Sequence, residues 1–250
     1  MLKLIGYEFR KSWIAKAILL GITALLEVVY VVGLLTSDEA TITIAAALLF
    51  MIATSGILVI GLMSVVVLHR DMNTRQGYML FMTPNSCYKI LGAKVLENGL
   101  SILVAGAFFT LLGALDVTLL FGHYNRLDEL WQMAQKILTS MVPGIRLENT
   151  VLILFLLTAL CSWVSTVVTA YFADVMASSV LRGKRGGGFV AFLIFLAINL
   201  LVGWATTKLG EAKLFKDVET LFIWSSVIDL ALAGLMYWLT ALVMERRLSV

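Results

Sequence analysis

The sequence contains little charge. Only 14% of its 250 residues are Asp, Glu, Lys or Arg, whereas 60% are hydrophobic. A soluble domain covers its surface with charged residues, which typically make up about a quarter of the chain, so this composition excludes an ordinary soluble protein. The net charge of +3 is too small to suggest nucleic-acid binding. We therefore predict an integral membrane protein with membrane lipids, and no nucleic acid, among its partners.

Residues that carry chemistry are also scarce. The two histidines, His69 and His123, fall on opposite sides of the membrane in the topology predicted below, so they cannot share a metal ion. No histidine lies within a span to activate a serine nucleophile, and no phosphate-binding loop of the pattern G-x-x-x-x-G-K-[ST] occurs. We expect no enzymatic activity, no metal and no ATP hydrolysis by this chain alone. The two cysteines, Cys87 and Cys161, are expected to be free thiols.

What the sequence has in abundance is long apolar segments. A membrane-spanning helix needs about 20 mostly apolar residues. Six segments meet this requirement, at residues 15–36, 42–68, 96–120, 150–173, 188–207 and 220–243. We predict an all-α polytopic fold with one transmembrane domain, residues 1–250. With the N-terminus inside, 13 of the 19 Lys and Arg residues fall in cytoplasmic segments, so both termini are predicted to be cytoplasmic.

Two stretches outside the spans have the pattern of interfacial helices. In residues 1–14, apolar side chains recur at helical spacing on one face, which predicts an amphipathic helix in the cytoplasmic interface. In the outer loop, Asn125 can cap a helix over residues 125–142, which has an apolar stripe and ends at Pro143. This outer helix either packs on the bilayer or covers the exit of a pathway.

The cytoplasmic connection over residues 70–94 is too long for a simple turn. A short helix with an apolar face fits before Pro84, which breaks it. The apolar side chains are Tyr78, Leu80, Phe81 and Met82. Asn85 or Ser86 can then cap a new helix that enters the third span. The short helix either docks in a partner's groove or packs under its own bundle.

This connection resembles the first intracellular loop of ATP-binding-cassette (ABC) type-2 exporter permeases. The matching residues are Gly77-Tyr78-Met79-Leu80-Phe81-Met82-Thr83-Pro84, followed by Lys89-Ile90-Leu91-Gly92-Ala93-Lys94. The N-terminal Tyr7-Glu8-Phe9-Arg10-Lys11 is similar to the opening elbow helix of the family. The sequence departs from the family pattern at two places. It has Ser86-Cys87 where the family often has Ser-Arg, and a short polar loop at residues 208–219 where many members have re-entrant helices.

The resemblance implies a transmembrane permease subunit in the plasma (inner) membrane of a prokaryote. It would pair with a like or related permease, as a homodimer or heterodimer, and with two copies of a separate ATPase that binds ATP and Mg²⁺. No cofactor is expected in this chain. The short cytoplasmic helix would be the coupling helix that contacts the ATPase. Its contact residues would be Gln76, Gly77, Tyr78, Met79, Leu80, Phe81, Pro84, Asn85 and Ser86. Asp71 and Arg75 are expected to add minor contacts at its rim.

Acidic residues inside the spans are costly and often functional. Glu27 and Asp229 lie near the middle of the first and last spans, with no Lys or Arg in the middle of any span. They either line a substrate pathway or are protonated or hydrogen-bonded between helices. Glu97, Asp116 and Asp174 lie nearer the span ends, where we expect water to reach them.

Three functions are therefore considered. The first is ATP-driven export of a hydrophobic or amphipathic substrate, which the loop resemblance favours. The second is proton-coupled secondary transport through Glu27 and Asp229, which would use the acids but leave the loop unexplained. The third is a non-transporting assembly or immunity protein that only binds a partner.

Overall fold

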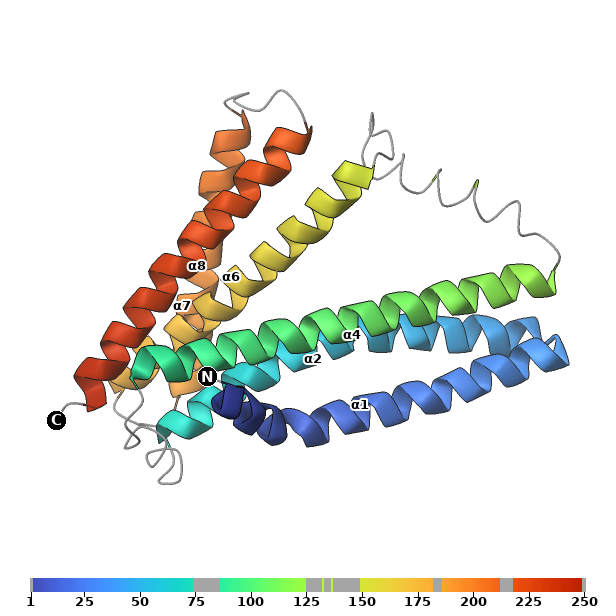
Figure 1. Cartoon of the computed structure of the whole chain (residues 1–250), viewed down its shortest axis with the longest axis horizontal. Helices are drawn as coiled ribbons and strands as arrows, with labels where there is room; N and C mark the ends of the chain where they lie inside the picture. Colours follow the sequence, from blue (N-terminus) through green and yellow to red (C-terminus); the bar gives the residue numbers. More distant parts are fainter. Residues whose placement is uncertain are drawn as a thin grey trace. The chain divides into compact units, whose positions relative to one another are not determined.

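Six long helices make up the part of the chain that the structure describes. The computed structural model describes residues 2–73, 86–124, 132, 136, 149–181, 186–211 and 218–248, in which there is no β-strand. The helices are α1 (Leu2–Thr36), α2 (Glu39–Asn73), α4 (Cys87–His123), α6 (Asn149–Leu181), α7 (Gly187–Glu211) and α8 (Val218–Leu248), as Figure 1 shows. Each is long and apolar enough to cross a membrane. The predicted all-α fold with six spans is confirmed.

The helices extend beyond the predicted spans. Helix α1 has 35 residues, which at about 1.5 Å per residue is longer than the roughly 30 Å of a bilayer's hydrocarbon core. The helix predicted over residues 1–14 is therefore present as the first turns of α1, and not as a separate element. The outer helix predicted over residues 125–142 and most of the predicted coupling helix lie outside the described residues.

A tight turn joins α1 to α2, where the sequence predicts a short outer connection. The N–H of Asp38 donates to the carbonyl oxygen of Gly33 at 3.1 Å, and that of Ser37 donates to Leu34 at 3.2 Å. Ser37 adopts a left-handed conformation with φ of 56°, which is the usual way to end a helix with this pair of bonds. Asp38 then caps α2 by accepting the N–H of Ala40 at 3.2 Å.

The described helices divide into two compact units. The first unit contains Met1–Glu8, Ser64–Gly99 and Leu147–Val250, and the second contains Phe9–Met63 and Leu100–Arg146. In the first unit α6 packs against α7 and α8. Its core combines buried residues of α2, α4, α6 and α8. They are Leu68, Leu91, Val167, Tyr171, Val175, Ala241 and Met244.

The second unit is built from the longer parts of α1, α2 and α4, and Figure 1 shows these helices running alongside one another. Its core consists of Tyr30, Leu34, Ile42, Ala45 and Leu49, with Leu26, Leu112 and Leu120 packed against them. The close approach of α1 and α2 depends on a glycine. A Cβ added at Gly33 would lie 3.2 Å from the backbone nitrogen of Ile42. In α4, by contrast, a Cβ added at Gly106 would meet no atom within 4 Å.

Two helices turn most of their apolar surface outward. None of the most apolar stretch of α7 is buried inside the chain, and only 6% of that of α4 is buried. In a membrane such surfaces contact lipid or another membrane-embedded protein. The exposed apolar surfaces of α4 and α7 are therefore consistent with the membrane location that the composition predicts.

Candidate functional site

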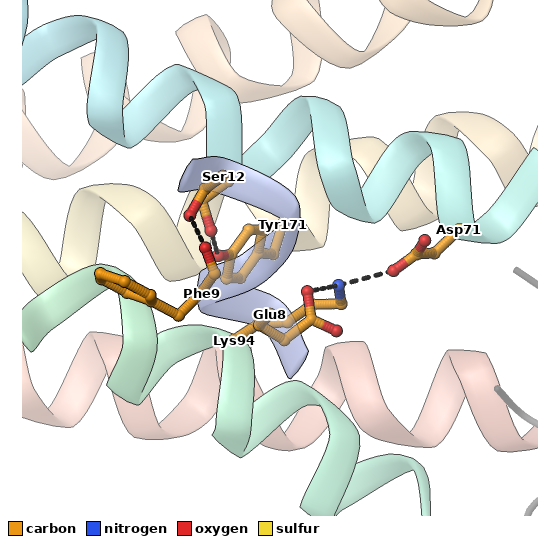
Figure 2. Close-up of polar contacts among 7 residues, drawn as sticks. Glu8, Phe9, Ser12, Asp71, Lys94 and Tyr171 are labelled. Atoms are coloured by element: carbon orange, nitrogen blue, oxygen red, sulfur yellow. Dashed lines mark hydrogen bonds and ion pairs between the residues drawn. The ribbon is translucent and has the colours of Figure 1, made fainter. Parts of the chain in front are cut away.

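The most unusual polar feature of the first unit is a buried lysine between two buried acids. The ammonium group of Lys94 donates to Glu8 Oε2 at 2.7 Å and to Asp71 Oδ2 at 2.7 Å. Figure 2 shows Lys94 between the two carboxyl groups. The side chain of Lys94 is 1% exposed, and those of Glu8 and Asp71 are 4% and 5% exposed. We call these three residues the Lys94 triad.

Each member of the triad comes from a different helix. Glu8 lies in the second turn of α1, Asp71 in the last turn of α2 and Lys94 near the start of α4. The end of α2 and the start of α4 flank the predicted coupling helix. The Lys94–Asp71 ion pair therefore joins the two ends of the connection that contains this predicted helix. The ion pair between Glu8 and Lys94 connects the N-terminal turns of α1 to the start of α4 as well.

Further polar contacts of the first unit involve α6. Tyr171 is fully buried, and its hydroxyl is hydrogen-bonded to that of Ser64. His69 Nδ1 lies 2.6 Å from Asp174 Oδ1. Asp174 is 5% exposed, whereas the imidazole of His69 is 44% exposed. The first unit thus has polar contacts between α2 and α6 in addition to the triad of α1, α2 and α4.

Helices α4, α6 and α8 also share hydrogen bonds. The indole N–H of Trp163 donates to Asn98 Oδ1 at 3.4 Å, and the hydroxyl of Tyr237 donates to the carbonyl oxygen of Tyr88 at 2.5 Å. Asn98 is 2% exposed. These contacts connect the N-terminal part of α4 to α6 and α8 by hydrogen bonds.

The structure corrects two expectations about acidic residues. Asp71 is not a rim residue, because it is buried and paired with Lys94. Glu97, Asp116 and Asp174 are not water-exposed, because they are 5%, 9% and 3% exposed. All four lie near the ends of the predicted spans, but the packing of the helices shields their side chains from solvent.

The predicted pathway acids have different partners. Glu27 belongs to the second unit, where its carboxyl group lies within hydrogen-bonding range of that of Asp116. Asp229 belongs to the first unit, where it is half-buried and hydrogen-bonded to Ser162. A role of Glu27 and Asp229 in a substrate pathway stays a prediction.

Most residues of the predicted coupling helix lie outside the described part of the chain. These are Gln76, Gly77, Tyr78, Met79, Leu80, Phe81, Pro84 and Asn85. Ser86 is described and exposed, and it caps α4. The N–H of Lys89 donates to Ser86 Oγ at 3.4 Å and to Ser86 O at 2.9 Å. The prediction that a helix leading into the third span begins here is confirmed.

Sequence reasoning missed the Lys94 triad. In the sequence, Lys94 is one of the cytoplasmic positive charges and the last residue of the matching loop, and Glu8 is part of the elbow motif. One local signal was available: Lys94, Glu97, Asn98 and Ser101 recur at helical spacing in a mostly apolar segment, and all four are buried. Such a polar stripe indicates a face that pairs with other helices, although it does not identify the partners.

The two cysteines, Cys87 and Cys161, are free thiols. Among the described residues no group of three His, Cys, Asp or Glu side chains could hold a metal ion. The Lys94 triad is an electrostatic link between three helices. No known protein family, curated protein or solved structure matches this chain.

Proposed function

We propose that the chain is the transmembrane permease subunit of an ATP-driven exporter. A separate ATPase would hydrolyse ATP and act on the segment between α2 and α4, and the substrate would be hydrophobic or amphipathic. Six membrane-length helices and the resemblance of residues 77–94 to the coupling loop of ABC type-2 permeases support this proposal.

The single observation that carries the proposal is the Lys94 triad at the base of this segment. A segment can pass force into the membrane only if its ends are firmly attached to the helices that must move. A buried ion pair provides such an attachment, because separating its charges away from water is unfavourable. Through Glu8 the same attachment includes α1, so displacement of the segment would act on α1, α2 and α4 together.

The proposal is tested first by purifying the full-length chain from its host in mild detergent. We expect an ATPase with a phosphate-binding loop to accompany it. Tyr78→Ala and Phe81→Ala should then weaken this association. Burial of an aromatic side chain is worth about 1.5–3 kcal/mol, which corresponds to a loss of about tenfold to a hundredfold in affinity.

A matched control is Tyr124→Ala, which removes an exposed aromatic side chain just beyond the other end of α4. This variant should keep the ATPase. The second readout is ATP hydrolysis by the purified complex, which should respond to Tyr78→Ala and Phe81→Ala and be unchanged in the control. The proposal fails if no ATPase accompanies the wild-type chain, or if both loop variants bind it and stimulate hydrolysis normally.

A further inference from the structure

We propose that Glu27 and Asp116 form a binding site for one small monovalent cation, a proton or an alkali-metal ion, within the second unit. The inference does not depend on the proposed exporter function, because it rests on the packing of α1, α2 and α4 alone.

The first step is the position of the two carboxyl groups. Glu27 on α1 and Asp116 on α4 lie within hydrogen-bonding range of each other. Asp116 follows Leu112 and precedes Leu120 by one helical turn each, and both leucines pack against the core of the unit. Asp116 therefore lies on the packed face of α4, and only 9% of its surface is exposed.

The second step is the rigidity of this contact. Tyr30, one turn after Glu27 on α1, is 2% exposed and donates its hydroxyl to the backbone carbonyl oxygen of Asp116 at 2.8 Å. Its ring belongs to the apolar core of the unit. The bond holds α1 against α4 at the level of the acids, which keeps the backbones that carry the two carboxyl groups close together.

The third step is that two buried oxygen atoms of the pair lack hydrogen-bond partners. Glu27 Oε2 and Asp116 Oδ1 are both buried, and neither has a hydrogen-bond partner among the residues that the structure describes. Buried acceptors without partners are unfavourable. A cation held between the carboxyl groups would satisfy both oxygens.

The fourth step is the charge around the pair. On α1, Lys16 is three turns earlier, roughly 16 Å along the axis, and its ammonium group donates to Ser101 at 2.6 Å. On α4, His123 is two turns after Asp116, and its Nε2 is hydrogen-bonded to Ser37 at 3.2 Å. The residues of α2 in this core, Ile42, Ala45 and Leu49, are uncharged.

Neither of these two basic side chains is therefore placed to neutralise the acids. Two adjacent carboxylates in an apolar environment repel each other strongly. One cation removes this repulsion, either as a proton shared in a hydrogen bond between the two groups or as an alkali-metal ion coordinated by both. One monovalent ion shared by the two groups is therefore enough to remove their mutual repulsion.

The test is thermal unfolding of the full-length chain in detergent, with NaCl, KCl or choline chloride at equal ionic strength, from about pH 6 to about pH 9. A ligand that binds only the folded state raises the unfolding temperature as its concentration rises. If the ion is a proton, the wild-type unfolding temperature should rise as pH falls in choline chloride. If it is an alkali-metal ion, the temperature at about pH 9 should rise with NaCl or KCl.

Glu27→Gln and Asp116→Asn should each abolish the dependence seen in the wild type, since each amide removes one negative charge and can donate to the remaining carboxylate. Asp229→Asn is the matched control, because it removes a half-buried acid of the first unit, and it should preserve the dependence. The inference is overturned if the wild type shows no cation dependence, or if Glu27→Gln and Asp116→Asn retain it. If either variant fails to fold, infrared difference spectra of the wild type between cation-free and cation-loaded states decide, and an unchanged carboxyl band overturns the inference.

Discussion

The ammonium group of Lys94 lies 2.7 Å from the carboxylate of Asp71, and this ion pair joins the start of α4 to the end of α2. A local sequence pattern would place both residues at a solvated membrane edge. In the structure both are buried, together with Glu8 from α1. The predictions below concern this triad, the turn between α1 and α2, and the orientation of the chain.

The first prediction concerns the Lys94 triad. Lys94→Met keeps most of the side-chain volume but removes the ammonium group that both buried carboxylates contact. Removing one partner of a buried ion pair typically costs about 3–5 kcal/mol. We expect a large drop in the unfolding temperature of the purified chain, measured by size-exclusion chromatography after heating.

The matched control for this prediction is Lys89→Met, because Lys89 lies on the same helix and is exposed. It should leave the unfolding temperature nearly unchanged. Asp71→Asn should destabilise the chain as well, in contrast to its expected minor role as a rim contact. Equal unfolding temperatures for Lys94→Met and Lys89→Met would contradict the triad.

The second prediction concerns helix packing next to the α1–α2 turn. A Cβ at Gly33 would lie 3.1 Å from Thr41 Cγ2 and 3.2 Å from the backbone nitrogen of Ile42. Gly33→Val should therefore lower stability by about 1–3 kcal/mol through overpacking. Gly106→Val is the comparison, since that position is open within the chain. The prediction fails if Gly33→Val unfolds at the wild-type temperature in detergent.

The third prediction concerns pH. The hydroxyl of Thr41, which donates to Asp38 Oδ2 at 2.5 Å, holds the pKa of Asp38 below its ordinary value, and the N–H of Ala40 contributes. A depressed pKa stabilises the folded turn above the unfolded pKa, and this stabilisation is lost as pH falls through the folded pKa. Thr41→Val keeps the shape and removes the hydroxyl, so it should raise the pKa of Asp38. Titration of the isotopically labelled carboxyl by NMR measures this change, and an unchanged pKa would contradict it.

The fourth prediction concerns orientation. Cysteine at Glu39, which is exposed at the start of α2, should react with a membrane-impermeant maleimide in intact cells. Cysteine at Lys184, in the predicted cytoplasmic connection between the fourth and fifth spans, should react only after permeabilisation. Both are made in a chain with Cys87 and Cys161 replaced by serine. The reverse pattern would contradict the predicted topology and, with it, the placement of the coupling segment.

Properties that depend on residues close together in the sequence could be predicted from it. The number of spans follows from runs of apolar residues, because each span must be apolar along its own length. The short connection between the first two spans and the cap at Ser86 follow from a few adjacent residues. These features do not require knowledge of which helices are neighbours.

Which residues meet in the Lys94 triad and in the Glu27–Asp116 pair was determined only by the tertiary structure. Lys94 pairs with residues 23 and 86 positions away, and Glu27 meets Asp116 on another helix. Hydropathy shows that a helix spans the membrane, but its rotation about its own axis is set by packing against its neighbours. A rotation of half a turn would move each of these charges from a buried contact to lipid. The sequence therefore determined the helices, and only their mutual packing determined which charges meet.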